Sequence, residues 1–223
     1  MAVMNSIPPV KRPLELAVET IRRKYPANLS RGPKATKEVY STGIESFDRL
    51  FPGGGIPSGQ LIEITGATSC GKTSLLFHIL AGLTKKSKAA YIDIGNMFFS
   101  DAAACCGVAL PRLVVVKPRR LAEAIRTTEL VLRHKLAGCV VCDLVGQRET
   151  LPMAWFHRLR AHTVRCRGIV FFITENNSQI IPPSMVSMQL EVSRRDDAVV
   201  HVRVSKSRIS PEGVWAEVRL DER

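Results

Sequence analysis

The sequence contains no uninterrupted apolar run approaching the ~18–20 residues that a membrane-spanning helix needs. Its first segment, Met1 to Pro13, also lacks the apolar core and the small-residue cleavage pattern of a signal peptide. These two absences predict a cytoplasmic protein without a membrane partner. With 223 residues, 45% of them apolar, the chain is long enough for one domain with a sizeable core and a tail.

Acidic residues are scarce relative to basic ones. The chain carries 20 Asp and Glu against 32 Lys and Arg, for a net charge of +12. A clustered basic excess of this size favours a polyanionic partner such as nucleic acid, and so a nucleoid-associated protein. The alternative is a basic protein with no such partner. Few aromatic residues accompany the basic clusters, so base stacking of the single-strand-binding type is not expected.

Cysteines with metal-ligand spacing are nearly absent. Among the six cysteines, only Cys139 and Cys142 share a C-x-x-C spacing, and they lie within an apolar run. Residues three apart in a strand face opposite sides, so this pair cannot hold one metal ion. We therefore expect buried, reduced thiols.

Two regions are distinguishable along the chain. Residues 1–37 form a Pro-rich arm, a candidate helix from Leu14 to Tyr25 and a basic linker, and residues 38–223 form the core. The candidate helix has an apolar stripe with helical spacing and ends at Pro26. The stripe must be covered either by a partner, by a neighbouring subunit or by the protein's own core.

The core alternates strand-like and helix-like segments. This alternation, followed by a run of strands, predicts an α/β fold with a mostly parallel central sheet flanked by helices and an antiparallel C-terminal extension. The expected strands are 61–65, 89–94, 113–117, 139–144, 168–174, 185–193, 199–205 and 214–220, and the expected helices are 72–83, 121–136 and 152–166.

A phosphate-binding loop follows the first of these strands. The pattern G-x-x-x-x-G-K-[ST] is met by Gly66, Ala67, Thr68, Ser69, Cys70, Gly71, Lys72 and Thr73. Glycines let the loop curl so that its N–H groups point at phosphate oxygens, and the following helix adds its positive end. The pattern assigns Lys72 to the β- and γ-phosphates and the Thr73 hydroxyl to Mg²⁺. We therefore expect ATP and Mg²⁺ as cofactors.

Such a loop also needs an acidic residue at the end of a buried strand to hold the Mg²⁺ shell. Asp143 follows the apolar run Val140-Val141-Cys142 directly and is therefore the acidic residue that we assign to this strand end. The alternative role of Asp143 is a helix cap for the segment that follows it.

Several motifs together resemble the core of bacterial RecA recombinase. They are S-T-G-I-E-S-F-D at 41–48, G-G-G-I-P-S-G-Q at 53–60, the phosphate loop, and Y-I-D at 91–93. The similarity runs from about Ser41 to Ser207. It implies a RecA-like fold, and RecA-like proteins bind ATP between the subunits of a filament on single-stranded DNA.

The sequence departs from that pattern at the residues of the recombinase apparatus. In the family a catalytic glutamate follows the aspartate of the I-D-x-E segment by two residues, and here that position is Gly95. Ala102 stands where the family has an adenine-stacking tyrosine. The strand end that carries a γ-phosphate-sensing glutamine has Glu175 instead, and both DNA-binding loops are short. The resemblance therefore implies a RecA paralogue with weak or absent ATP hydrolysis.

Small, basic RecA-like proteins with these losses resemble the ImuA family, accessory proteins of the bacterial mutagenic translesion-synthesis cassette. That family is encoded with an inactive polymerase-like partner, ImuB, and an error-prone polymerase under damage-response (SOS) control. The resemblance implies binding to DNA, to RecA and to an ImuB-type protein, with self-association as a further possibility.

Clusters of basic residues are the candidate DNA contacts. Those that we expect to bind phosphates, without sequence preference and with strong salt dependence, are Arg158, Arg165, Arg194, Arg195, Arg203, Lys206 and Arg208. The alternative for each cluster is a solvated face.

Three functions remain open at this point. The first is a non-catalytic or weakly catalytic accessory protein in DNA damage tolerance. The second is a DNA-stimulated RecA- or KaiC-type ATPase motor, with Glu175 as the candidate catalytic carboxylate. The third, a signalling or clock-type ATPase, is disfavoured because no duplicated domain is visible.

Overall fold

The computed structural model describes residues 38–220. The predicted arm, the helix Leu14–Tyr25 and the linker to residue 37 lie outside the described residues. The described residues all fall within one compact unit, Glu38–Arg223, and the predicted division of the chain at residue 37 stays a prediction.

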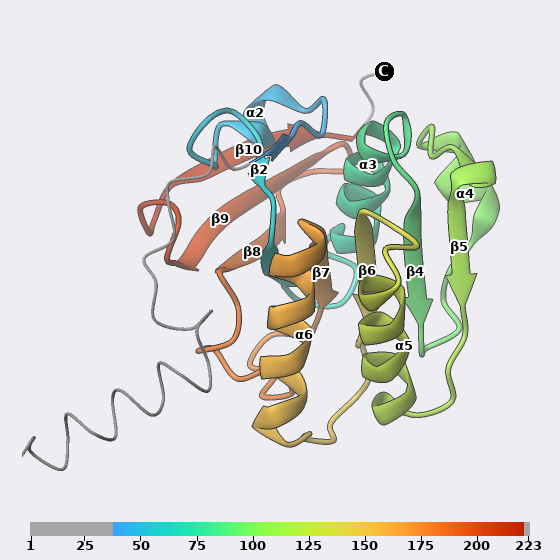
Figure 1. Cartoon of the computed structure of the whole chain (residues 1–223). Coiled ribbons are helices and arrows are strands. Elements are labelled where there is room, and N and C mark those ends of the chain that lie inside the picture. Colours follow the sequence, from blue (N-terminus) through green and yellow to red (C-terminus); the bar gives the residue numbers. More distant parts are fainter. Residues whose placement is uncertain (1–37, 221–223) are drawn as a thin grey trace, which may run out of the picture. The chain divides into compact units, whose positions relative to one another are not determined.

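An eight-stranded sheet forms the centre of the described unit (Figure 1). Its order is β10 (Trp215–Arg219), β9 (Val199–Ser207), β8 (Met188–Arg194), β3 (Gln60–Thr65), β7 (Ile169–Ile173), β6 (Cys139–Asp143), β4 (Ala89–Asp93) and β5 (Leu113–Val116). The six strands β8, β3, β7, β6, β4 and β5 are parallel to one another. Strand β9 is antiparallel to β8, and β10 is antiparallel to β9. The predicted α/β fold is confirmed, with the refinement that β8 belongs to the parallel part and the antiparallel extension begins at β9.

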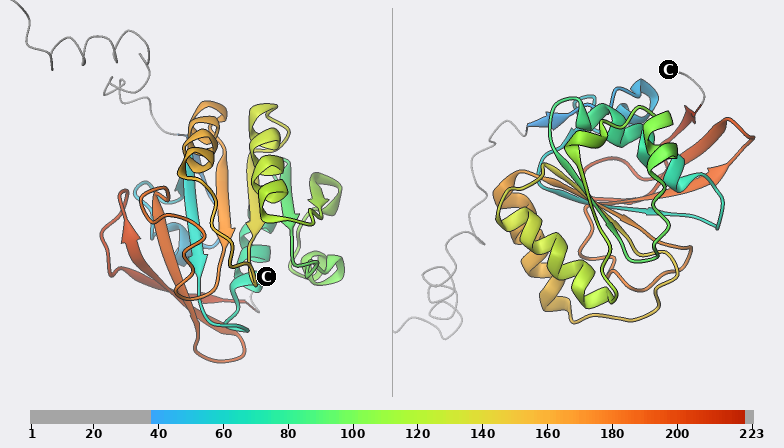
Figure 2. Two further views of the ribbon diagram at one scale, coloured as in Figure 1. Left: turned by 90° about the horizontal axis from the view of Figure 1, so that it is seen from below. Right: turned by 90° about the vertical axis from the view of Figure 1, so that its right-hand side faces the viewer.

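Helices cover both faces of the parallel strands (Figure 2). One face packs against α3 (Lys72–Thr84), together with the short helices α2 (Glu45–Asp48) and α4 (Ser100–Cys105). The other packs against α5 (Leu121–Arg133) and α6 (Met153–Cys166). Every residue of β3, β4, β6 and β7 is buried, which explains why these strands appear in the sequence as near-continuous apolar runs.

The two core clusters confirm the expected orientation of the cysteine pair. Cys139 belongs to the cluster on the α3 face, and Cys142 belongs to the cluster on the α5–α6 face. Both thiols are buried, and burial raises the pKa of each to about 12. Within residues 38–220, no group of three or more His, Cys, Asp or Glu is arranged to hold a metal ion.

Helix α5 is shorter than the sequence predicts, since it ends at Arg133 and not at Leu136. Lys135 has a left-handed backbone with φ of 52°. The N–H of Leu136 donates to the Val131 carbonyl at 3.0 Å, and that of Lys135 donates to the Leu132 carbonyl at 3.0 Å. This is the Schellman termination, which usually has glycine at the left-handed position. A lysine there leaves no sequence signal for the helix end.

Short elements also escaped prediction. They are α2, α4, the 3₁₀ turn η2 (Leu110–Arg112) and a two-stranded sheet of β1 (Val39–Tyr40) and β2 (Ile56–Pro57). The Ser41–Thr42 segment is fixed by Asp48, whose carboxylate accepts hydrogen bonds from the Thr42 N–H and from both hydroxyls at 2.7–3.1 Å. A Cβ added at Gly82 of α3 would lie 1.7 Å from the Thr42 carbonyl oxygen, so this segment packs directly on the helix backbone.

A buried carboxylate joins three neighbouring strands. Glu63 of β3 is 1% exposed and accepts hydrogen bonds from Thr174 Oγ1 at 2.8 Å and from Gln189 Nε2 at 3.0 Å. Ser205 Oγ of β9 in turn donates to Gln189 Oε1 at 3.2 Å. Desolvation raises the pKa of Glu63, and the two hydrogen bonds oppose that rise.

Candidate nucleotide site

The phosphate loop lies between β3 and α3, in the strand–loop–helix context that the motif requires. Two of its glycines have no room for a side chain. A Cβ at Gly66 would lie 2.4 Å from the Val192 carbonyl oxygen, and one at Gly71 would lie 2.6 Å from a Val200 methyl group. Gly71 also has φ of 92°, a conformation that favours glycine. Strands β8 and β9 therefore support the outer side of the loop.

Helix α3 presents an uncapped N-terminus to the loop. No side chain caps it, and its first turn contains no acidic residue. No side chain of α3 therefore neutralises the partial positive charge at its N-terminus, and this free charge favours the binding of an anion. Thr73 lies in this first turn and is exposed.

The ammonium of Lys72 is turned toward its own loop. The side chain is buried, and Nζ donates to the carbonyl oxygens of Gly66 and Ala67, both at 2.6 Å. Cys70 Sγ lies 3.7 Å from the same nitrogen. The loop thus holds the lysine head group at its centre.

Asp143 ends β6, paired in register with Asp93 of β4 and Ile173 of β7. Its Oδ2 accepts a hydrogen bond from the Tyr91 hydroxyl at 2.8 Å, and its Oδ1 accepts one from the Val145 N–H at 3.2 Å. Desolvation raises the pKa of this carboxyl group, whereas the hydrogen bonds from Tyr91 and Val145 and the charge of Lys72 lower it. The Val145 contact forms a local turn and not the helix cap that was the alternative role of Asp143, because the next helix, α6, begins only at Met153 and has no side-chain cap.

Asp93 is committed to the backbone that follows β4. It is fully buried, and its two oxygens accept hydrogen bonds from the N–H groups of Met97 and Phe98, both at 2.9 Å. Gly95 lies within the segment that these bonds fix. A Cβ at Gly95 would meet only Met97 Cγ at 3.4 Å and the Val145 carbonyl oxygen at 3.9 Å, so a side chain fits there.

Glu175 lies next to the start of the phosphate loop. Its carbonyl oxygen accepts a hydrogen bond from the hydroxyl of Thr65, the last residue of β3, at 3.0 Å. Its side chain lines a pocket of about 210 Å³ together with Gln147 and Arg148. Ala102 is half-buried in α4 and packs against the core cluster on the α3 face.

The seven candidate DNA contacts lie on two separate elements. Five are on or beside the β8–β9 hairpin: Arg194, Arg195, Arg203, Lys206 and Arg208. The other two are on α6. Arg158 of α6 lies 3.5 Å from Glu129 of α5 and 5.6 Å from the Trp155 ring centre, so it links the two helices. Arg165 is in the last turn of α6.

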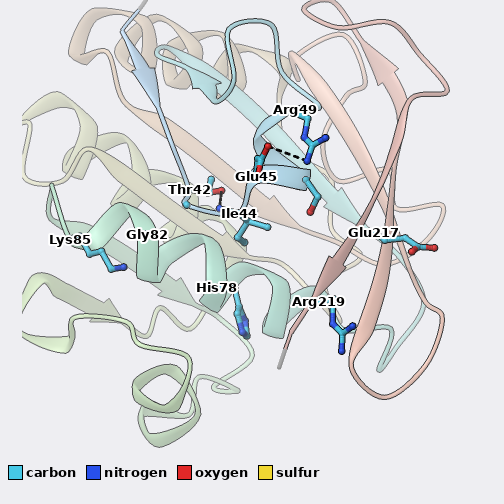
Figure 3. A pocket seen from close by; sticks show the side chains of 11 residues that line it. Thr42, Ile44, Glu45, Arg49, His78, Gly82, Lys85, Glu217 and Arg219 are labelled. Atoms are coloured by element: carbon cyan, nitrogen blue, oxygen red, sulfur yellow. Dashed lines mark hydrogen bonds and ion pairs between the residues drawn. The ribbon is translucent and has the colours of Figure 1, made fainter. Parts of the chain in front are cut away.

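A separate cavity lies away from the phosphate loop, and Figure 3 shows the side chains that line it. It measures about 620 Å³ and lies between the segment 42–49, α3 and β10. None of the eight phosphate-loop residues lines it. Two of its lining residues are acidic and both are ion-paired, Glu45 with Arg49 at 3.3 Å and Glu217 with Arg195. In the described part of the chain, no helix has the length and apolar character needed to cross a membrane.

With this geometry established, similarity to known proteins identifies the family. A family model described as the RecA N-terminal domain matches residues 12–150. The chain belongs to the RecA family. Protein RecA of Chlamydia muridarum (strain MoPn / Nigg) is 34% identical over 147 residues, which are 63% of this chain and 42% of that protein. Protein RecA of Roseiflexus sp. (strain RS-1) is 35% identical over 145 residues, 62% of this chain and 41% of that protein.

The chain thus spans less than half the length of these RecA relatives. Among solved structures, the crystal structure of the RadB recombinase matches with a TM-score of 0.66 and 19% identity. The match covers 81% of this chain and 95% of the RadB chain. It establishes the RecA-like α/β fold of the described unit.

Two residues near these candidate sites were missed in the sequence. Tyr91 was recognised only as part of the Y-I-D motif, because nothing local indicates that its hydroxyl reaches Asp143. Trp215 is 56% exposed on β10, directly opposite Arg203 of β9. An exposed aromatic residue therefore does accompany a basic one here, contrary to the expectation from composition. The alternation of buried and exposed residues in β10 is the signal that points to it.

Proposed function

We propose that this RecA-family chain binds ATP at the loop Gly66–Thr73. The observation that carries the proposal is the uncapped start of α3 behind a loop whose Gly66 and Gly71 have no room for side chains. The loop N–H groups and the positive helix end would receive the phosphates. Lys72 would exchange at least one of its two carbonyl contacts for a phosphate oxygen.

The residues present also fit Mg²⁺. The Thr73 hydroxyl lies in the first turn of α3, directly after the loop. The Asp143 carboxylate lies at the end of β6, which belongs to the same sheet as β3, the strand before the loop. Hydroxyl and carboxylate oxygens are ligands suited to this ion. Mg²⁺, when bound, would neutralise phosphate charge, while Tyr91 orients the Asp143 carboxylate.

We further propose that hydrolysis is weak or absent. Gly95 supplies no carboxylate at the position that the RecA resemblance assigns to water activation, and both oxygens of the buried Asp93 already accept backbone N–H groups. General-base catalysis by a positioned side chain contributes about 10²–10⁴-fold to a rate. Nucleotide would then act as a bound ligand that stabilises one conformation or one complex.

The biological role we propose is that of an accessory protein in the DNA damage response, of the ImuA kind, in error-prone translesion synthesis. It would act in the cytoplasm on the nucleoid, through DNA, a RecA filament and an ImuB-type polymerase-like partner. The net charge of +12 and the short segments after β6 and β7 support binding without recombination. Adjacent genes for a polymerase-like pair, and co-purification with their products, would support this role.

Binding of a fluorescent ATP analogue tests the nucleotide site. Lys72→Ala should abolish binding, and Lys85→Ala, at the far end of α3, is the matched control that should bind normally. Equal binding by wild type and Lys72→Ala would show that the assignment is wrong.

The second candidate is a DNA-stimulated ATPase motor. The observation that favours it is the position of Glu175, whose backbone is hydrogen-bonded to the residue preceding the phosphate loop. In this case single-stranded DNA should raise ATP turnover strongly, and Glu175→Gln should remove that increase. In the accessory role, turnover stays low and Glu175→Gln leaves it unchanged.

A further inference from the structure

Within residues 38–220, strands β8, β9 and β10 have one face that no residue of the core clusters occupies. Val192, Val202 and Val218 point to the α3 side and are buried. The residues between them point to the opposite side, where Figure 1 shows β9 lying beside α6 and not behind it. Two rows cross this open face in register: Glu191, Arg203 and Trp215, then Ser193, His201 and Glu217.

An aromatic pair stands on this face. The ring of Trp215, which is 56% exposed, contacts the half-buried ring of His201 with centroids 4.9 Å apart and an interplanar angle of 33°. A side chain held by a neighbouring ring loses less freedom when a ligand stacks on it. The pair therefore forms a pre-organised flat surface.

Positive charge surrounds the pair. Arg203 pairs with Trp215 across β9 and β10, and exposed Lys206 of β9 lies on the same face, in register with Gln189. Of the acids in the two rows, Glu217 is ion-paired with Arg195, which leaves Glu191 as the carboxylate that opposes these charges. The balance on the face is positive, as a polyanion requires.

We propose that the open face of β8–β10 is a stacking site for bases of single-stranded DNA, with Trp215 as its platform. This inference rests on the DNA binding proposed above and assigns it a place. Aromatic side chains on an exposed sheet stack unpaired bases, while neighbouring Arg and Lys follow the phosphates. Bases inside a duplex are stacked on each other and do not present their faces to Trp215.

The composition of the face favours DNA over a protein partner. The core of a protein–protein interface is depleted in charge. Here Trp215 is flanked by Arg203, His201 and Glu217. Val214, at 38% exposure, is the large apolar neighbour in sequence. A polyanion with flat aromatic groups matches this mixture.

Fluorescence anisotropy with a labelled oligo(dT) and a labelled duplex, at low salt, tests the inference. Trp215→Leu should weaken oligo(dT) binding by roughly 5- to 150-fold, the range expected when one base–aromatic stack is removed. Trp215→Phe should restore most of the affinity, and duplex binding should change little. In a Trp155→Phe background, oligo(dT) should quench the remaining emission of Trp215. Unchanged thermal unfolding and ATP-analogue binding verify that the variants are folded.

Three results would overturn the inference. If Trp215→Leu binds oligo(dT) like wild type while charge reversal of Arg194 and Arg195 weakens it, DNA is bound by phosphate contacts alone, and the proposed function survives. If wild type binds neither DNA at low salt, the proposed DNA binding itself fails. If sedimentation shows a wild-type oligomer that Trp215→Leu dissociates, the face is an interface between copies of the chain.

Discussion

The Tyr91 hydroxyl donates a hydrogen bond to Oδ2 of Asp143 at 2.8 Å, which links β4 to the strand end that we assign to Mg²⁺. Tyr91 is almost fully buried, and its ring packs against Phe77 and Phe98 with centroids 6.2 and 4.9 Å away. The carboxylate orientation is therefore fixed by a rigid aromatic cluster. Desolvation and the neighbouring Asp143 charge raise the pKa of Tyr91 well above its usual value, so it remains a donor.

Removing this hydroxyl should weaken the response to Mg²⁺. Loss of a hydrogen bond that orients a metal ligand typically costs 10–100-fold in metal affinity. Tyr91→Phe should therefore raise the Mg²⁺ concentration that half-saturates ATP-analogue binding by about 10-fold or more. Tyr40→Phe is the matched control, because the Tyr40 hydroxyl bonds the Arg167 carbonyl at 3.1 Å. An unchanged Mg²⁺ dependence in Tyr91→Phe would exclude the orienting role.

Gly95 offers a gain-of-function experiment. It has room for a side chain, with its nearest neighbours for a Cβ at 3.4 and 3.9 Å. Gly95→Glu should raise ATP turnover, with about 10²–10⁴-fold as the upper range for a well-placed general base. Gly95→Gln, of similar size but without the carboxylate, should not. Equal turnover in both variants and wild type would show that the missing carboxylate alone does not limit hydrolysis.

Glu63 should make stability depend on pH. Burial raises its pKa above the usual 4.5, so the folded state binds this proton more tightly than the unfolded chain. The resulting stabilisation is complete below the unfolded pKa and is lost as pH rises through the folded pKa. Each tenfold difference in proton affinity corresponds to about 1.4 kcal/mol.

Glu63→Gln should therefore gain stability relative to wild type as pH rises above about 4.5. Urea unfolding between pH 4 and 8, with exposed Glu149→Gln as the control, measures the difference. A difference that is constant across this range would mean that Glu63 does not titrate abnormally.

The two arginines at the end of β8 should contribute to DNA binding through phosphate charge. Reversing Arg194 and Arg195 to Glu should weaken binding uniformly across DNA sequences. On single-stranded DNA, the slope of log affinity against log salt should fall by about 0.7 for each phosphate that the variant no longer neutralises. Arg133→Glu, an exposed arginine at the end of α5, is the control. Binding that does not depend on salt would contradict the proposed role of these charges.

Much of the fold was predictable because its strands are buried on both faces. The phosphate loop and the end of β6 at Asp143 follow from local patterns, so the sequence places both correctly relative to the strands. What it does not contain is the long-range pairing. The contacts of Tyr91 with Asp143 and of Glu63 with Thr174 and Gln189 join residues 52, 111 and 126 positions apart.

The end of α5 was misjudged for a different reason. Leu132 and Leu136 keep the helical spacing of four, and a lysine, not a glycine, adopts the left-handed conformation at 135. The stacking pair was missed because it depends on which strands become neighbours. Trp215 and His201 meet only because β10 pairs with β9.

ATP retention at the phosphate loop with scarcely any hydrolysis is the proposal on which the other nucleotide predictions depend. Its most direct test is a single-turnover measurement of γ-labelled ATP bound to the isolated protein with Mg²⁺, with and without single-stranded DNA. We expect label to be retained by wild type, lost in Lys72→Ala, and released as phosphate only slowly whether or not DNA is present. Failure to retain label, or rapid phosphate release stimulated by DNA, would contradict it.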